Sequence, residues 1–243
     1  MLTKNQIKLI TSLKQKKFRT QHQLFVVEGI KVVEEFLNSE YELDAIFALD
    51  DRFSHYNQKF TLVDSKELAK ISGFSTPNKV LATFKIPKLQ AIDWSSLVVA
   101  LDGVNDPGNL GTIIRLCDWF GIENLACSEE TVDCYNPKVV QASMGSHTRV
   151  NISYLDLKKT LPSASNCMGT FMEGVSVYEQ NLPKTAVIVL GNEANGISKE
   201  IEGLMHTRLS IPRFGKLKQT ESLNVANAAA IILSEFKKNT IET

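Results

Sequence analysis

The sequence lacks the features that would indicate a membrane protein, a disulfide-rich protein or a zinc protein. No apolar run among its 243 residues reaches the roughly 20 residues that a membrane-spanning helix needs. The cysteines show no C-x-x-C pair and no histidine at ligand spacing. They are Cys117, Cys127, Cys134 and Cys167. We therefore expect reduced thiols in the core, no metal and no membrane partner.

An excess of charge of either sign is also missing, since 27 basic residues balance 27 acidic ones. An anionic partner would have to be bound by local patches rather than by the field of the whole protein, and nucleic acid is not excluded.

The N-terminus lacks the apolar stretch of a secretory signal peptide. Its basic, acid-poor start is similar to a transit peptide, but it has few serines and leads into a strand-like segment, so we expect a cytoplasmic protein.

The pattern of apolar residues predicts two α/β domains, a small one over residues 1–88 and a larger one over residues 93–243, joined by a linker near Pro87. In the first we expect helices at 4–17, 30–39 and 65–71 and strands at 24–29, 44–49, 60–64 and 79–86. In the second we expect strands at 97–102, 124–129, 167–173, 186–191 and 208–212 and helices at 112–120, 138–146, 198–205 and 223–236.

Strands of the second domain are continuously apolar, as in "AVIVLG", which is typical of a parallel sheet covered on both faces. The fold class predicted for this domain is therefore doubly wound α/β. In such sheets a ligand binds at the carboxyl ends of the strands, so the loops after "ALD", "VLG" and "SIP" are the candidate site.

The first of these loops opens the segment "LDGVNDPGNLGTIIRLCDWFG", residues 101–121. Its glycines do not form the G-x-G-x-x-G of a dinucleotide site, and no Lys-Ser or Lys-Thr pair follows Gly111 as a P-loop requires. What remains is Asn109 in the loop and Arg115 in the following helix. An arginine among apolar residues needs a partner or an anion, although a salt-bridged surface arginine is the other interpretation.

The second and third loops carry a carboxylate and a basic stretch. In "VIVLGNEANGIS", Glu193 follows a core strand, although an ordinary tight turn of Gly and Asn would explain the pattern too. In "IPRFGKLKQTESLNVANAAAIIL", a basic loop leads into the last helix, which Ser222 or Thr220 could cap. Capping alone would not explain three loops of unusual composition at one edge of one sheet.

Together these segments resemble the three motifs of the SpoU (TrmH-like) family of RNA 2'-O-ribose methyltransferases, within the SPOUT class, over roughly residues 97–237. The resemblance implies transfer of a methyl group from S-adenosylmethionine to a ribose 2'-hydroxyl, with ribosomal RNA as the expected substrate and transfer RNA as the alternative. It also implies a C-terminal trefoil knot and a homodimer that completes the site. General topology rules argue against a knot, so the knot rests on the resemblance alone.

The resemblance assigns site residues by their places in the three motifs. The implied catalytic residues are Asn109, Arg115, Glu193, Ser222 and Asn224. The implied cofactor-binding residues are Thr170, Gly191, Ile211 and Leu223. A residue without Cβ at position 191 would let the backbone approach a ligand closely. The loop from Arg213 to Glu221 is longer than the corresponding loop of most family members. The first domain resembles the small substrate-binding domain that precedes the catalytic domain in many members.

The chemistry favours a positioning role for Arg115. A guanidinium stays protonated near neutral pH, so we expect it to clamp the phosphate next to the 2'-hydroxyl rather than to act as a free base.

Basic clusters support RNA binding. Residues 1–31 hold seven Lys or Arg against one Glu, and residues 204–220 hold four Lys or Arg and no acidic residue. Such clusters are also typical of solvated faces. The rival functions are a nucleotide-dependent oxidoreductase, disfavoured by the missing fingerprint, and a non-catalytic RNA-binding protein.

Overall fold

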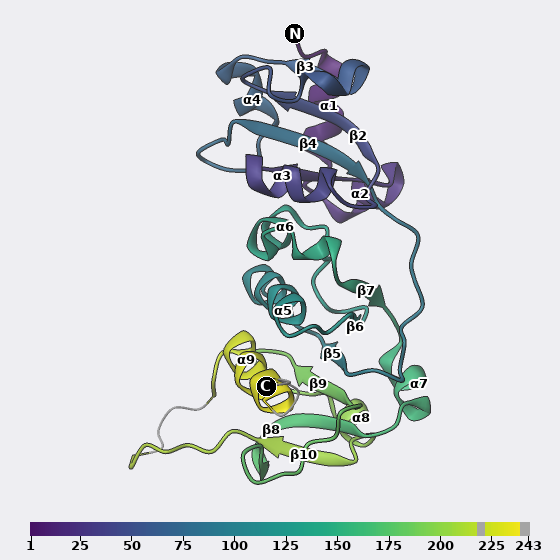
Figure 1. Ribbon diagram of the computed structural model, residues 1–243, viewed down its shortest axis with the longest axis vertical. Helices are drawn as coiled ribbons and strands as arrows, with labels where there is room; N and C mark the ends of the chain where they lie inside the picture. The colour runs from purple at the N-terminus through teal and green to yellow at the C-terminus, as the bar shows by residue number, and fades with distance from the viewer. Residues whose placement is uncertain (218–221, 239–243) are drawn as a thin grey trace. The chain divides into compact units, whose positions relative to one another are not determined.

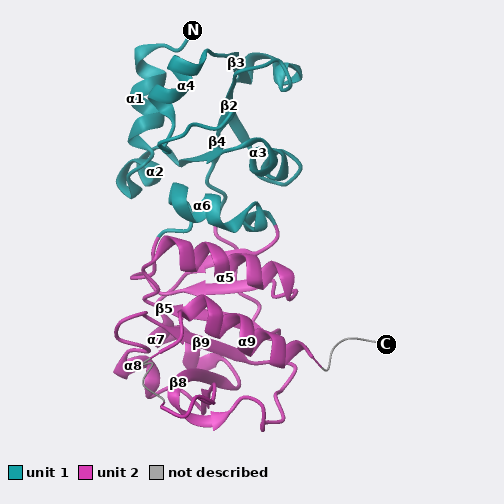
Figure 2. Cartoon of the chain, turned by 90° about the vertical axis from the view of Figure 1, so that its left-hand side faces the viewer, with its two compact units in different colours: residues 1–88, 133–148 teal, residues 89–132, 149–243 magenta. Residues whose placement is uncertain are grey.

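A computed structural model describes residues 1–217 and 222–238 of the protein. The chain divides into two compact units, shown in teal and magenta in Figure 2. Unit 1 contains residues 1–88 and 133–148, and unit 2 contains residues 89–132 and the chain from 149 onward. Within the described ranges, no helix is long and apolar enough to cross a membrane. Residues 133–148, which the sequence analysis assigned to the second domain, are thus grouped with unit 1.

Unit 1 is built on a four-stranded sheet in the order β1-β4-β2-β3, in which β4 is antiparallel to both of its neighbours and β3 is parallel to β2. Its strands are β1 (Leu24–Glu28), β2 (Leu43–Ala48), β3 (Phe60–Leu62) and β4 (Val80–Lys85). Its helices are α1 (Lys4–Ser12), α2 (Lys16–His22), α3 (Ile30–Leu37), α4 (Ser65–Ile71) and α6 (Pro137–Ser143).

The single helix expected over residues 4–17 is wrong, because the chain forms two helices there. The first helix, α1, ends at its C-cap Leu13, and Gln15 is extended (φ −102°, ψ 134°) before α2 begins. The buried Arg19 of α2 donates from Nη1 to the carbonyl oxygen of Leu13 at 2.8 Å. This bond satisfies a carbonyl at the end of α1 that has no partner within its own helix.

The core of unit 1 includes aromatic residues and receives a segment from far along the chain. Phe25 and Phe36 are fully buried and meet edge to face, with ring centroids 5.5 Å apart. Val140 of α6 belongs to the same cluster. Arg19, only 2% exposed, donates from Nε to Asp133 Oδ2 at 2.9 Å. Burial of both apolar and paired charged groups therefore holds residues 133–148 in this unit.

Unit 2 contains a six-stranded parallel sheet in the order β10-β8-β9-β5-β6-β7 (Figure 1). Its strands are β5 (Val98–Asp102), β6 (Asn124–Cys127), β7 (Asn151–Tyr154), β8 (Cys167–Ser176), β9 (Val187–Gly191) and β10 (Thr207–Ser210). Its helices are α5 (Pro107–Trp119), α7 (Leu157–Thr160), α8 (Lys199–Glu202) and α9 (Val225–Lys237). The predicted α/β fold with a parallel sheet is confirmed.

Helices lie on both sides of this sheet. Val98 and Ala100 of β5 pack with Leu157 of α7 and Ile201 of α8. Figure 1 shows α5 and α9 on the opposite side, where these two helices contact each other. Successive strand residues face opposite sides, so a strand covered in this way is apolar throughout. The arrangement is the one expected for a doubly wound sheet.

Candidate active site

The carboxyl ends of the central strands meet at one edge of the sheet in unit 2. Asp102 at the end of β5 pairs with Gly191 at the end of β9. Gly169 of β8 pairs with Val189 of β9 on one side and with Arg208 of β10 on the other. Parallel pairing therefore brings the segments that follow β5, β8, β9 and β10 out of the sheet at the same edge, where a ligand site is expected.

The carboxylate of Glu193 joins the loop after β9 to the start of α5. Its Oε1 accepts from Asn109 Nδ2 at 2.9 Å and from the backbone N–H of Asp106 at 3.2 Å, and its Oε2 accepts from the N–H of Asn105 at 3.2 Å. Asp106 is the N-cap of α5 and accepts from the N–H of Asn109 at 2.8 Å. The sequence analysis placed Asn109 in the loop before the helix. This is wrong, because Asn109 lies in the first turn of α5.

Asn224 joins the last helix to the same network. Its Nδ2 donates to Asn109 Oδ1 at 2.8 Å, while its Oδ1 accepts from the N–H groups of Ala226 at 2.9 Å and Asn227 at 3.2 Å. These bonds make Asn224 the N-cap of α9. The capping role considered for Ser222 is therefore wrong: Ser222 is exposed, and the other candidate, Thr220, lies outside the described residues. An Asn oxygen satisfies two otherwise unpaired N–H groups of the first turn.

Two further polar residues, which the sequence analysis did not single out, fix the same loops. Asn192 donates from Nδ2 to the carbonyl oxygen of Gly103 at 2.6 Å and accepts at Oδ1 from the N–H groups of Ala194 and Asn195 at 3.0 and 3.1 Å. Asp102 Oδ2 accepts from the N–H of Ser198 at 2.7 Å. Their place at the ends of core strands is the signal that could have found them.

Gly191 occupies a position where no side chain fits. A Cβ atom added there would lie 2.2 Å from both the carbonyl carbon of Gly196 and the backbone nitrogen of Ile197. The loop after β9 folds back on the end of its own strand, and Asn192 and Gly196 form a β-bridge. The glycine is therefore required by the backbone of this loop, in addition to any contact with a ligand.

Hydrogen bonding keeps Glu193 ionised. Desolvation would raise the pKa of this carboxyl group, but the hydrogen bonds from Asn109, from its own backbone N–H and from Asn105 and Asp106 together lower the pKa below its usual 4.5. The start of α5 adds a favourable field for negative charge. Near neutral pH the group is a carboxylate that only accepts hydrogen bonds.

Replacing Glu193 with Gln should lower stability in a pH-dependent way. An amide puts a donor where the carboxylate accepts three bonds, and the expected loss at pH 7 is about 1 kcal/mol, or about 2–4 °C in melting temperature, for this partly exposed group. Because the pKa is lower in the folded than in the unfolded chain, this contribution is present above pH 4.5 and is lost as pH falls through the folded pKa. Thermal melts of both proteins from pH 7 to pH 3 should show the difference disappear.

Glu200→Gln is the matched control, since Glu200 is exposed in α8 of the same unit. It should melt like the wild-type protein at each pH. A Glu193→Gln difference that stayed constant down to pH 3 would show that the charge is not what the network recognises.

Arg115 lies outside this network. Its side chain is exposed on α5 and makes no hydrogen bond or ion pair with any residue that the structure describes. It lies six positions after Asn109, so at 3.6 residues per turn the two side chains leave the helix on different faces. Trp119, four residues further on, shares the face of Arg115 and is 84% exposed. The salt-bridged interpretation of Arg115 thus finds no partner among the described residues.

The residues expected to bind the cofactor lie along the same edge. Thr170 directly follows the paired Gly169 of β8, and Ile211 directly follows β10; both are half-buried. Leu223, 49% exposed, precedes the cap of α9. Neither Ile211 nor Leu223 makes a backbone hydrogen bond with another described residue, so their peptide groups are available to a ligand. The longer loop, 213–221, is described only as far as Leu217.

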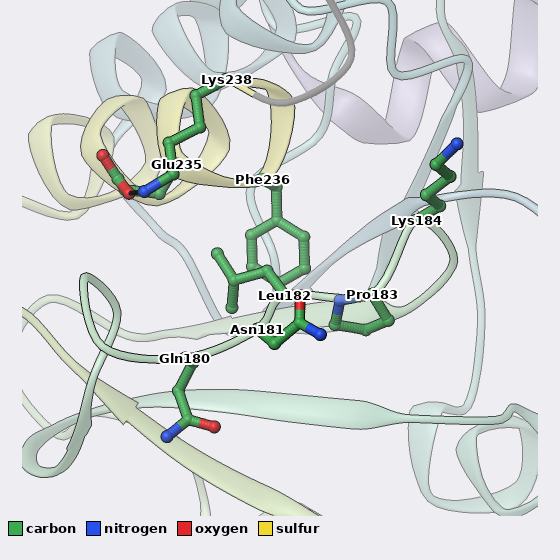
Figure 3. Close-up of a pocket in the computed structure, with 8 residues that line it drawn as sticks. All are labelled: Gln180, Asn181, Leu182, Pro183, Lys184, Glu235, Phe236 and Lys238. Atoms are coloured by element: carbon green, nitrogen blue, oxygen red, sulfur yellow. Dashed lines mark hydrogen bonds and ion pairs between the residues drawn. The ribbon is translucent and has the colours of Figure 1, made fainter.

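A cavity of about 320 Å³ in unit 2 lies at the other end of β9. Figure 3 shows the ring of Phe236, near the end of α9, beside Leu182 and Pro183, which precede the strand. The residues of the network do not line this cavity. Hydrogen-bonded polar groups converge at the carboxyl edge instead, so we assign the site to that edge. Over the described part of the chain, no three His, Cys, Asp or Glu residues are grouped to hold a metal ion.

Comparison with known proteins relates the chain to RNA methyltransferases along its whole length. It is 29% identical over 250 residues to a 23S rRNA (guanosine(2553)-2'-O)-methyltransferase, RlmP, of Bacillus subtilis, covering 96% of this chain and 97% of that protein. A structure of a putative RNA methyltransferase of the TrmH family from Porphyromonas gingivalis superposes with a TM-score of 0.89 at 37% identity, covering 98% of this chain and 99% of that one.

A second structure, an AdoMet-bound rRNA methyltransferase from Sinorhizobium meliloti, superposes with a TM-score of 0.88 at 28% identity, covering 100% of this chain and 97% of that one. The model of the MRM3-like substrate binding domain matches residues 4–82. The model of the SpoU rRNA Methylase family matches residues 96–234, which include the three loops of the site. The chain therefore belongs to the SpoU rRNA methylase family.

Proposed function

We propose that the protein transfers a methyl group from S-adenosylmethionine to a ribose 2'-hydroxyl of ribosomal RNA. The observation that carries the proposal is the hydrogen-bonded chain Glu193–Asn109–Asn224, which ties three loops together at the carboxyl edge of the sheet. These are the loops of the three motifs, in a chain that belongs to the SpoU family. The named relatives act on 23S rRNA or hold AdoMet, which supports the substrate and the cofactor.

The edge of the sheet suits the proposed cofactor. Backbone groups of Ile211 and Leu223, which make no backbone hydrogen bond with another described residue, can bind the edge of a purine, and the half-exposed Leu223 offers apolar surface for its ring. Gly191 lies at the end of β9, and Thr170 lies within β8, directly after the last residue that pairs with β9. When bound there, S-adenosylmethionine supplies a methyl group activated by a positively charged sulfur.

Methyl transfer is an in-line displacement, in which the C–O bond forms as the C–S bond breaks and the hydroxyl proton leaves. Its rate depends on alignment of the oxygen, carbon and sulfur atoms. We assign Arg115 to binding the phosphate next to the reacting ribose, so that it orients the 2'-hydroxyl and that phosphate can accept the proton. Asn109 and Glu193 order the loops, and Asn224 positions the start of the last helix as its N-cap. Ser222, exposed two residues before that cap, is assigned to the site itself.

The remaining features of the proposal concern the domains. Residues 1–88 would bind the RNA, with the basic residues of positions 1–31 neutralising phosphates, and residues 93–243 would catalyse the transfer.

We also propose that the C-terminal chain forms the trefoil knot of the SPOUT class. After β10, at the edge of the sheet, the chain comes back so that α9 contacts α5 and β9, which supports this proposal. A cytoplasmic location fits a ribosomal RNA substrate.

The proposed function is tested by binding and turnover with the purified chain. Calorimetry should show binding of S-adenosylmethionine that a chelator does not abolish, and no binding of nicotinamide dinucleotides. Total RNA from a strain that lacks the protein should accept methyl groups. Binding of nicotinamide cofactors would favour the oxidoreductase instead. Cofactor binding without turnover would favour a non-catalytic RNA-binding protein, and transfer only to the small RNA fraction would favour transfer RNA.

A homodimer is also expected, formed by unit 2 and completing the site. The exposed Trp119 on the face of Arg115 is the feature of the structure that favours it. Ala226 and Ala229 are small residues of α9 that could allow a second subunit to approach closely, but both are buried and pack inside the subunit. Light scattering should give twice the chain mass, and Trp119→Ala should weaken the dimer. A monomeric wild-type protein at micromolar concentration would contradict this.

A further inference from the structure

Two exposed aromatic side chains lie just beyond the ends of β8 and β10. Phe214 is 82% exposed and Tyr178 is 42% exposed, and their ring centroids are 6.3 Å apart with 41° between the ring planes. Two aromatic rings that lie together and open to solvent form an apolar patch, which is a feature of interaction sites. We call Phe214 and Tyr178 the aromatic pair.

The backbone places the aromatic pair at the edge of the sheet that carries the candidate active site. Ser176 pairs with Ser210, and the N–H of Val177 donates to the carbonyl oxygen of Ser210 at 2.9 Å. The two segments thus leave the parallel strands side by side. Figure 1 shows the segment after β10 running outward from the sheet. Ile211, assigned above to the cofactor, lies three residues before Phe214, so the pair flanks the proposed site of methyl transfer.

The charge next to the aromatic pair indicates what would cover it. The described part of the loop that carries Phe214, residues 211–217, holds Arg213 and Lys216 and no acidic residue. The acidic residues of the neighbouring segment, Glu173 and Glu179, are exposed as well. An aromatic surface within a basic loop suits RNA, because phosphates bind the cations while every base offers a flat face for stacking. A partner surface of protein would gain nothing from the cations unless it were acidic.

We propose that the aromatic pair stacks on an unpaired base of the RNA substrate next to the nucleotide that is methylated, and that Phe214 is a specificity-determining residue. The inference rests on the proposed function. A ribose 2'-hydroxyl is most accessible to an in-line attack geometry in a loop or bulge, where bases are unstacked. Stacking such a base on the protein would hold the strand in place while Arg115 binds the phosphate, and the stacking preference would select single-stranded targets.

The proposal predicts that Phe214→Ala in the full-length protein weakens RNA binding about tenfold, which is within the range for losing one base–aromatic stack. The measurements are the dissociation constant for a labelled single-stranded oligoribonucleotide of mixed sequence and the KM for ribosomal RNA from a strain that lacks the protein. Affinity for S-adenosylmethionine, kcat at saturating RNA and the melting temperature should stay within about twofold or about 2 °C of wild type.

Two variants and one control separate stacking from simple apolar contact. Phe214→Trp should restore or strengthen RNA binding, because indole stacks on bases at least as well as phenyl. Phe214→Leu keeps apolar bulk without a π face and should resemble Phe214→Ala. Leu217→Ala is the matched control, since Leu217 is 79% exposed in the same loop. It should bind RNA like the wild-type protein.

Three results would overturn the proposal. RNA affinity of Phe214→Ala equal to that of wild type would remove the stacking role. A parallel loss of S-adenosylmethionine affinity would assign the ring to the cofactor. Loss of the dimer in light scattering, restored by Phe214→Leu, would show that a second copy of the chain covers the pair. If the wild-type protein methylates no RNA at all, the proposed function fails, and the oligoribonucleotide affinities still test the aromatic pair by themselves.

Discussion

Arg115→Ala is expected to slow single-turnover methyl transfer by about a hundredfold or more while leaving the fold and the cofactor affinity nearly unchanged. The reason lies in the surroundings of this side chain. It is exposed and makes no hydrogen bond or ion pair with any described residue, so folding loses no such interaction when it is removed. An orienting contact with the RNA phosphate would instead be lost in full.

Two further variants, Arg115→Lys and Arg149→Ala, test whether the effect is specific to the guanidinium of Arg115. Arg115→Lys should recover little of the rate, because an ammonium keeps the charge but not the planar fork that binds two phosphate oxygens. Arg149→Ala serves as the matched control: Arg149 pairs with Asp118 in the same unit, with Nε 2.9 Å from Oδ2, and its side chain is 47% exposed. Its loss should cost no more than about 1 kcal/mol of stability and leave the rate unchanged.

Rate, cofactor affinity and melting temperature are best measured on one sample of Arg115→Ala. A rate that fell only as far as the folded fraction would assign Arg115 a structural role. Normal turnover by a well-folded sample would exclude it from the reaction.

Gly191→Ala is expected to prevent normal folding of unit 2. The added Cβ would lie 2.2 Å from two backbone atoms of residues 196 and 197, and backbone cannot move aside as a flexible side chain can. The loop that carries Glu193 would have to open, so the hydrogen bonds to Asn109 and to the start of α5 would be lost with it. We expect a loss above about 4 kcal/mol in the free energy of unfolding, seen as aggregation or a much lower melting temperature.

Gly203→Ala provides the comparison. A Cβ there would meet its nearest atom, the carbonyl oxygen of Lys199, at 3.7 Å, which is an ordinary contact. This variant should melt within a few degrees of wild type. A Gly191→Ala protein that also folded cooperatively near the wild-type melting temperature would mean that the loop after β9 is less tightly closed than the structure has it.

The central strands could be predicted from the sequence because their apolar runs are continuous. The runs at 97–102 and 186–191 correspond to β5 and β9, and both strands are covered on two faces. In contrast, β7 was missed, since its four residues at the edge of the sheet are mostly half-buried and lack an apolar run. The position of the site at the carboxyl edge followed from the parallel sheet itself.

The links within the site could not be predicted from local pattern. The side-chain bond from Asn109 to Glu193 spans 84 residues, and the bond from Asn224 to Asn109 spans 115. Only the resemblance to a family brought these residues together in advance, and it did not show that Asn224 caps α9. Likewise, the bond between Arg19 and Asp133 spans 114 residues, so nothing in the sequence near 133–148 indicated that this segment packs in unit 1.

The most direct test of the account follows the methyl group into RNA. Total RNA from a strain that lacks the protein is incubated with the purified chain and S-adenosylmethionine carrying a deuterated methyl group, then digested to nucleosides and analysed by mass spectrometry. The account predicts one deuterated nucleoside that carries its label on the ribose 2'-oxygen, derived from the ribosomal RNA fraction and formed about a hundredfold or more slowly with Arg115→Ala. Label on a base, or no label in RNA under conditions where the cofactor binds, would contradict it.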